Sequence, residues 1–503
     1  MVIVFVLVGV AVLAVLGGSH WYAWRRLVRD TTAGPGALRR VGAVVFAAGP
    51  LLMFGAVASE RAGAPFWLQR TLAWPGFLWM AVLLYLVLAL LAGEFVRPVL
   101  RRLVERRAGG RQETDGAASP AAVGEAGPRE SVRARSGAAA TMSGDGGAGA
   151  RTATTGPSGR SSSTRPAEQP GQPESAERPE SAVEPGPIGH VGPEGPAEPT
   201  GPIEPTGPTE PTGPTEPTEV TEPTEAVRLP SRRLFVSRVV GGAAAAVAVG
   251  TVGYGTYGVL RGPSVKRVTV PLAKLPRSAH GFRIAVVSDI HLGPVLGRGF
   301  AQKVVDTINS TQPDLIAVVG DLVDGSVKDL GPAAAPLAGL RARHGAYFVT
   351  GNHEYFSGAE QWVREVRELG IHPLENARTE LAGFDLAGVN DVQGESEGQG
   401  PDFGKALGDR DTTRACVLLA HQPVQIHDAV RHGVDLQLSG HTHGGQLWPG
   451  NLIAAAANPT VAGLERYGDT QLYVSRGAGA WGPPTRVGAP SDITVVELAS
   501  REA

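Results

Sequence analysis

Hydrophobic residues gather in three long runs near the start of the chain, at residues 2–21, 41–58 and 72–92. Each run is about long enough for a helix to cross a hydrocarbon core of roughly 30 Å. The runs lack the polar face that helices of a soluble domain turn towards water, which makes three buried helices of a soluble domain the weaker interpretation. The pattern therefore predicts a membrane region with three transmembrane helices at residues 1–107.

Arginines are distributed unevenly around these runs. One group follows the first run and another follows the third, whereas only Arg61 and Arg70 lie between the second and the third. Because positively charged loops stay on the cytoplasmic side, we expect the N-terminus outside and the segment after the third run inside. The two groups are Arg25, Arg26, Arg29, Arg39 and Arg40, and Arg97, Arg101, Arg102, Arg106 and Arg107.

A long segment of different composition follows, at residues 108–230. It consists mainly of Gly, Ala, Ser, Pro, Glu and Thr, and it contains the near-repeat EPTGPTEPTGPTEPTEVTEPTE. So few apolar side chains cannot offset the entropy lost when a backbone is ordered. The composition predicts a disordered linker with proline-stiffened stretches, and a docking site for a proline-binding partner is the alternative.

The next segment, residues 231–262, combines a twin arginine with a mildly apolar run. SRRLFVSR precedes the run at residues 239–260 and is similar to the twin-arginine export signal S-R-R-x-F-L-K. It departs from that signal at Val236 and Ser237, and it lies inside the chain. A fourth membrane helix or signal anchor is the alternative interpretation. Both interpretations place the arginines inside and everything after residue 260 outside.

The remaining residues, 265–503, alternate between two kinds of pattern. Short runs rich in Val, Ile and Leu lie at residues 282–287, 315–319, 346–349, 417–420 and 436–438, with helix-like segments at 300–310 and 359–369. Alternating strands and helices predict a layered α/β domain. Since the strands are apolar throughout, we expect sheets that are covered on both faces.

Each of these five strands is followed by polar residues: SDIHLG, GDLVDG, TGNHEY, AHQP and GHTHGG. Residues beyond the carboxyl ends of strands in an α/β sheet meet at a common edge. Carboxylates and imidazoles gathered there without cations would leave unpaired charges, whereas metal ions turn them into ligands. The candidates are Asp289, His291, Asp321, Asp324, Asn352, His353, His421, His441 and His443.

Spacing and neighbours support this interpretation. In D-x-H at Asp289 and in H-x-H at His441, residues two apart in an extended chain point to the same side. The glycines Gly440, Gly444 and Gly445 lie beside the two histidines of the last motif, and they allow a close approach of the backbone. We therefore expect each pair to reach one metal cluster.

Overall composition narrows the class of protein. The formal net charge of the 503-residue chain is −2, so there is no global electrostatic case for binding nucleic acid. The single cysteine, Cys416, lies in an apolar strand and excludes an internal disulfide or a cluster of thiolate ligands. The candidate ligands are therefore nitrogens and oxygens, which suit Zn²⁺, Mn²⁺ or Fe.

The five motifs together resemble the signature of the calcineurin-like metallophosphoesterase superfamily: D-x-H, G-D-x-x-D, G-N-H-[DE], a lone His and G-H-x-H. All five stand in order within residues 265–503, and the membrane region and the linker lie outside the resemblance. Within the superfamily, the chain is similar to bacterial membrane-associated or twin-arginine-exported phosphoesterases. The resemblance implies a layered α/β sandwich of mixed β-sheets flanked by helices.

The resemblance also implies a role for each candidate residue. Two divalent metal ions are expected, one held by Asp289, His291, Asp321 and His443, the other by Asp321, Asn352, His421 and His441. His353 is similar to the general acid of the family, and Asp324 to the residue that orients it. Many relatives carry an arginine after the second Asp of G-D-x-x-D, where this chain has Gly325, so one phosphate contact is expected from elsewhere.

These roles imply an enzyme, a metal-dependent phosphoric ester hydrolase. Hydroxide formed between the metals would attack phosphorus, and His353 would protonate the leaving oxygen. We expect a phosphodiesterase with lipid or cell-wall substrates, anchored in the cell membrane by several spans with its catalytic domain outside the cytoplasm. The alternatives are a phosphomonoesterase or protein phosphatase, and a non-catalytic metal-bearing binding module of the envelope.

Overall fold

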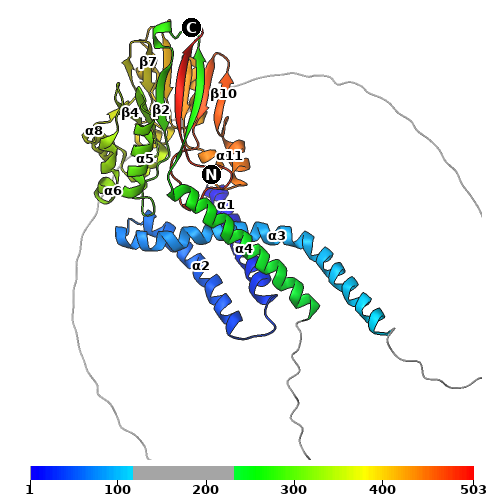
Figure 1. The fold of residues 1–503 in the computed structure, drawn as a ribbon. Coiled ribbons are helices and arrows are strands. Elements are labelled where there is room, and N and C mark those ends of the chain that lie inside the picture. The colour runs from blue at the N-terminus through cyan, green and yellow to red at the C-terminus, as the bar shows by residue number, and fades with distance from the viewer. Residues whose placement is uncertain (1, 117–230, 503) are drawn as a thin grey trace, which may run out of the picture. The chain divides into compact units, whose positions relative to one another are not determined.

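The computed structural model describes residues 2–116 and 231–502 (Figure 1), so most of the linker expected at 108–230 lies outside the described residues. Helices α2, α4 and the first part of α3, Phe66–Arg106, are long enough and apolar enough to cross a membrane. The four long helices are α1 Val2–Trp24, α2 Ala37–Arg61, α3 Phe66–Gly116 and α4 Arg232–Leu260.

The boundaries of the long helices follow from local sequence. Helix α4 begins after Ser231, whose hydroxyl oxygen accepts a hydrogen bond of 3.3 Å from the backbone N–H of Leu234. The twin arginine therefore forms the first turn of a helix. Helix α3 continues to Gly116, beyond the boundary expected at residue 107.

Residues 264–502 contain two six-stranded mixed sheets, in the orders β1-β12-β2-β3-β4-β5 and β10-β11-β9-β8-β7-β6. Strands β2 to β5 are parallel in the first sheet, and β11, β9, β8 and β7 are parallel in the second. The strands are β1 Ser264–Leu272, β2 Phe282–Val287, β3 Leu315–Val319, β4 Ala346–Val349, β5 His372–Pro373, β6 Ala377–Glu380, β7 Phe384–Gly388, β8 Ala415–Leu419, β9 Leu436–Ser439, β10 Gly463–Tyr467, β11 Thr470–Val474 and β12 Asp492–Ser500.

Three hydrophobic clusters hold these layers together. Along β2, Ile284 and Val286 join a cluster between the two sheets, while Ala285 and Val287 join one under α5, α6 and α8. A third cluster lies under α9 and α10 against the second sheet. The helices are α5 Arg298–Ser310, α6 Val327–Ala334, α7 Asn352–Ser357, α8 Ala359–Glu368, α9 Phe403–Leu407, α10 Ile426–Arg431 and α11 Gly450–Ala457.

The domain is thus a sandwich of two mixed sheets flanked by helices, which confirms the fold class predicted from the sequence. Successive residues of a strand point to opposite faces of the sheet. Strands that are apolar throughout therefore contribute side chains to two hydrophobic clusters at once. Cys416 is fully buried in β8, as expected for a core residue.

Candidate metal centre

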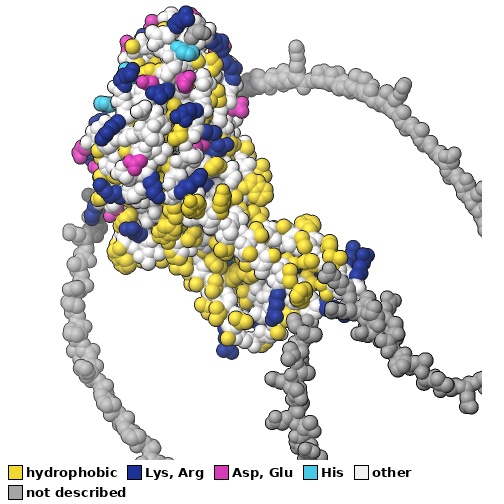
Figure 2. Space-filling model, viewed as in Figure 1, with side chains coloured by type: hydrophobic (Ala, Val, Ile, Leu, Met, Phe, Trp, Pro, Cys, Tyr) yellow, Lys and Arg dark blue, Asp and Glu magenta, His cyan; other side chains and the backbone are white. Residues whose placement is uncertain are grey.

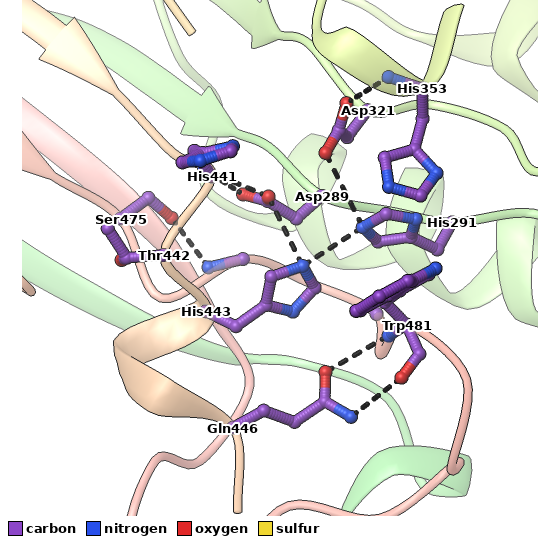
Figure 3. A network of polar contacts seen from close by, with 12 residues as sticks. Asp289, His291, Asp321, His353, His441, Thr442, His443, Gln446, Ser475 and Trp481 are labelled. Carbon is purple, nitrogen blue, oxygen red and sulfur yellow. Dashed lines mark hydrogen bonds and ion pairs between the residues drawn. The ribbon is translucent and has the colours of Figure 1, made fainter. Parts of the chain in front are cut away.

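Five strands of the two sheets deliver the candidate residues to one place. β2, β3 and β4 of the first sheet and β8 and β9 of the second end beside one another, and each candidate lies within five residues of a strand end. Figure 3 shows Asp289, His291, Asp321 and His443 turned towards one another. The structure therefore brings together residues that are as much as 154 positions apart, from 289 to 443.

The backbone at the candidate residues has an unusual conformation. Asp289, His291, Asp321, His441 and His443 have φ angles of 51°, 48°, 54°, 71° and 52°. The expectation that the D-x-H and H-x-H pairs lie in extended chain is therefore wrong, because their backbone turns in the left-handed region. A non-glycine residue there is strained by about 1–3 kcal/mol. Such strain is commonest at functional sites.

One group of candidate ligands consists of Asp289, His291 and His443, whose ligand atoms lie within 4.8 Å of one another. His443 Nε2 is 2.9 Å from His291 Nε2 and 3.4 Å from Asp289 Oδ1. All three side chains are buried. Nitrogen and oxygen atoms that converge in this way can share one cation.

A second group consists of Asp321, His421 and His441, also within 4.8 Å of one another. His421 Nε2 is 3.1 Å from Asp321 Oδ2, and His441 Nδ1 is 3.0 Å from the side-chain oxygen of Asn352. The same Oδ2 atom of Asp321 lies 3.7 Å from His291 Nε2 of the first group. Asp321 thus stands between the two groups.

The surroundings of His421 fit a metal ion. Its Nδ1 lies 2.9 Å from the carbonyl oxygen of Val319, which can only accept, so Nδ1 carries the proton. Its buried Nε2 faces Asp321 Oδ2 at 3.1 Å but is not aligned for a hydrogen bond with it. Burial alone would lower the pKa of His421, but the charge of Asp321 outweighs burial and raises it well above its usual value. The side chains of His421 and Asp321 are therefore stabilised by a cation between them, either a proton or a metal ion.

His443 is held by a residue that the sequence did not reveal. Arg486 donates hydrogen bonds of 3.0 Å to the carbonyl oxygen and to Nδ1 of His443, and one of 3.2 Å to the carbonyl oxygen of Ala489. Burial lowers the pKa of His443 well below its usual value, and the charges of His291 and Arg486 act in the same direction. His443 is therefore kept neutral, with its proton on Nε2 because Nδ1 accepts from Arg486; a metal ion at Nε2 would require that proton to leave.

His353 lies beside the two groups and is oriented by Asp324. His353 Nδ1 is 2.6 Å from Asp324 Oδ1, and the same oxygen lies 3.0 Å from His291 Nδ1. Burial would lower the pKa of His353, but the hydrogen bond and charge of Asp324 outweigh it and raise the pKa to about 9. Because Nδ1 is engaged, Nε2 is the atom left to exchange a proton.

Glu354 fixes the loops that carry the ligands. Its carboxylate accepts hydrogen bonds from the backbone N–H groups of Asp321, Leu322 and Gly351, at 2.9, 2.7 and 2.6 Å. Burial, helped by the charge of Asp321, raises the pKa of Glu354 to about 7. One side chain thus joins the loop after β3 to the loop after β4.

The glycines of the last motif have two different functions. A Cβ atom at Gly440 would collide with the Asp289 carboxylate and with the Ser288 side chain, so this glycine does make room for a candidate ligand. Gly444 and Gly445 instead approach Arg476 and Asn451. The expectation that all three glycines serve the cluster directly is therefore correct only for Gly440.

Two exposed aromatic rings that belong to none of the five motifs border the site. The rings of Phe356 and Trp481 each lie 5.6 Å from the ring of His353, in edge-to-face orientation. Gly325 stands where many relatives have arginine. Its carbonyl oxygen accepts a hydrogen bond of 2.8 Å from the indole N–H of Trp362. Two exposed aromatic rings therefore stand beside His353.

A sandwich of mixed sheets with Asp and His groups at the strand ends defines a metallophosphoesterase-type domain. The chain belongs to the calcineurin-like phosphoesterase family, whose model matches residues 282–445. The match confirms the superfamily and the enzyme class that the motifs predicted.

Three relatives illustrate the match. A transmembrane protein with metallophosphoesterase domain from Danio rerio is 39% identical over 259 residues, which cover 49% of this chain and 59% of that protein. An uncharacterized metallophosphoesterase of Aquifex aeolicus is 35% identical, and the match covers 46% of this chain and 91% of that protein. The uncharacterized metallophosphoesterase YkuE of Bacillus subtilis is 30% identical, and the match covers 54% of this chain and 98% of that protein. The match spans less than two thirds of the zebrafish protein. Since animal and bacterial proteins both match, the narrower bacterial branch stays a prediction.

Proposed function

We propose that this chain is a membrane-anchored, metal-dependent phosphodiesterase that hydrolyses phosphate esters of lipids or of the cell envelope. The observation that carries the proposal is the position of Asp321 between two groups of nitrogen and oxygen ligands. In this proposal Asp289, His291, Asp321 and His443 hold one divalent cation, and Asp321, Asn352, His421 and His441 hold the other. The ligand types suit Zn²⁺, Mn²⁺ or Fe.

When bound, the two cations supply Lewis-acid activation of the phosphoryl group and of the attacking water. The residues of the chain have other tasks. His353, held through Nδ1 by Asp324, carries a proton at neutral pH and donates it from Nε2 to the leaving oxygen. Burial raises the pKa of the Cys416 thiol to about 12, so the one cysteine of the chain does not act as a nucleophile.

Gly325 supports a diester substrate over a monoester. A phosphomonoester carries about −1.5 to −2 charges at pH 7, whereas a diester carries a single negative charge. The arginine that many relatives place at this position adds a cationic contact, and this chain does not have it there. A substrate of lower charge needs fewer such contacts.

The proposed activity is tested with the full-length chain in detergent, stripped of metal and reloaded with Mn²⁺ or Zn²⁺. We expect metal-dependent hydrolysis of bis(p-nitrophenyl) phosphate that exceeds hydrolysis of p-nitrophenyl phosphate. His441→Ala should abolish it, because a ligand is lost, whereas His427→Ala, at an exposed histidine of α10, should not. Faster monoester hydrolysis would identify a phosphatase. No turnover with two metals bound would identify a binding module.

We also propose that the chain crosses the membrane several times and that its catalytic domain lies outside the cytoplasm. The uneven distribution of arginines supports this orientation. In this orientation the end of α2, the start of α3 and the end of α4 lie on the outer side of the membrane. The catalytic domain contacts the helices near these ends, where Val295 packs against Ala56 and Phe77 and Thr256 shares a hydrogen bond of 2.7 Å with Thr485, and also along α3 at Tyr85.

Reporter fusions after Ala503 test this orientation. We expect a fused alkaline phosphatase, which is active only outside the cytoplasm, to be active, and a fused green fluorescent protein to stay dark. The residues that set the orientation are arginines, so replacing Arg39 and Arg40 with glutamine should weaken it. A silent phosphatase with a bright fluorescent fusion would place the domain in the cytoplasm.

A further inference from the structure

Helix α11 is unusual among the helices of the catalytic domain because it has neither a buried residue nor a charged one. Leu452 and Ile453 are 65% and 75% exposed, and Trp448, just before the helix, is 53% exposed. Figure 2 shows hydrophobic side chains over this part of the domain, whereas Lys, Arg, Asp and Glu gather elsewhere on it. Apolar surface of this kind is unfavourable in water and marks an interaction site.

Exposed hydrophobic side chains are concentrated near the metal centre. Five of the seven large ones in the described part of the domain belong to α11, to Trp448 or to the aromatic pair beside His353. The seven are Phe356, Val424, Val430, Trp448, Leu452, Ile453 and Trp481. The apolar surface and the candidate site are therefore neighbours.

Gln446 joins α11 to the rim of the site. Its side-chain amide donates hydrogen bonds to the carbonyl oxygens of Trp481 and Pro483, at 2.9 and 3.1 Å, and its oxygen accepts one of 3.0 Å from the Trp481 N–H (Figure 3). Gln446 lies three residues after His443 and four before the start of α11. The chain between His443 and α11 is therefore tied to the loop that carries Trp481.

The segment that leads into α11 touches the long apolar helices. The carbonyl oxygen of Trp448 accepts a hydrogen bond of 2.9 Å from the hydroxyl of Tyr85 in α3. Leu447 packs against a hydrophobic cluster built from α1, α2, α3 and α4. These helices are proposed to lie in the membrane, so α11 begins three residues after a residue that packs against the membrane region. No charged side chain on α11 opposes contact with lipid.

We propose that α11 and Trp448 are inserted in the lipid bilayer beside the long apolar helices and hold the metal centre close to it. The substrate is then a phosphodiester carried by a bilayer lipid, which reaches His353 past Phe356 and Trp481. Hydrolysis adds water across one P–O bond and yields a phosphomonoester and an alcohol. This inference rests on the phosphodiesterase activity proposed above.

The position of α11 is tested by labelling the full-length chain in phosphatidylcholine vesicles. Ile453→Cys and, as a control, Arg431→Cys carry a fluorescent label, while fully buried Cys416 stays unlabelled. We expect nitroxide-bearing lipids to quench the Ile453 label several times more strongly than the Arg431 label. Equal quenching of both by a water-soluble quencher, with none by the lipid, would overturn the inference.

Substrate choice is tested with two diesters that differ only in one alcohol, p-nitrophenyl methyl phosphate and p-nitrophenyl hexadecyl phosphate. In vesicles we expect the hexadecyl ester to be hydrolysed about tenfold faster, because its chain places it in the bilayer. The double variant Leu452→Asp/Ile453→Asp should lose this preference and keep the rate on the methyl ester, whereas Val430→Asp should keep both. Inactivity of the unmodified chain on both esters contradicts the proposed function. Equal rates on both contradict the insertion of α11.

Discussion

Replacing Asp321 with asparagine is expected to lower kcat/KM for phosphodiester hydrolysis by about a thousandfold or more and to reduce the bound metal below two per chain. Asp321 Oδ2 lies 3.1 Å from His421 Nε2 and 3.7 Å from His291 Nε2, so one carboxylate serves both groups. Lewis-acid stabilisation is worth several kcal/mol of transition-state free energy, and each 1.36 kcal/mol is tenfold in rate. Asparagine has nearly the same size, so the fold should survive.

The measurement pairs steady-state kinetics with the metal content of the purified chain. Asp435→Asn is the matched control, because Asp435 is also buried but pairs with Lys274 at 3.4 Å and accepts from the Cys416 N–H at 2.9 Å, away from the site. The Asp435→Asn variant should keep both metals and its activity, and only its free energy of unfolding should fall. If Asp321→Asn kept two metals and nearly full activity, Asp321 would not be the shared ligand.

Replacing His353 with asparagine is expected to lower kcat by about 10²–10⁴-fold for substrates with alkyl leaving groups. An alkoxide needs a proton as it leaves, and His353 is the group placed to give it. A p-nitrophenolate leaves without that help, so p-nitrophenyl esters should be affected much less. Equal losses for both leaving groups would show that His353 positions the substrate and does not supply a proton.

The pH dependence provides a second view of His353. The acid form exists below its pKa, which Asp324 raises to about 9 against the effect of burial, so the alkyl-ester rate should fall as the pH rises through that value. Bound cations oppose the rise, so the fall occurs at or below about pH 9. Asp324→Asn should move the fall to lower pH by roughly one to two units at saturating metal. An unmoved fall would assign the titration to another group.

Five interior strands could be predicted from the sequence because their residues are apolar throughout, whereas β7, β11 and β12, which are also interior, were not predicted. The runs at 282–287, 315–319 and 346–349 coincide with β2, β3 and β4, and those at 417–420 and 436–438 lie within two residues of β8 and β9. Strands such as β1 and β10 escaped prediction because charged residues interrupt them. Strand β1 pairs with β12, more than 200 residues away, and no local pattern reveals such a partner.

The candidate site was predicted by residue type but not by geometry. Asp289 and His443 could be proposed because each stands in a motif at the end of a strand. Arg486 and Trp481 could not, because each lies in a loop without a recognisable motif and reaches the site only through the fold. The left-handed backbone of the ligands was equally hidden, since nothing in D-x-H or H-x-H distinguishes it from extended chain.

That backbone has a consequence for how the family can change over time. Glycine adopts positive φ angles without steric penalty, so it would relieve the strain at Asp289, His291, Asp321, His441 and His443. Backbone strain alone would therefore favour glycine at these five positions, whereas the metal chemistry and the hydrogen bonds that Asp289 and Asp321 accept from the backbone of His441 and His353 oppose it. A relative in which several of them have become glycine would have kept the sandwich while giving up the reaction.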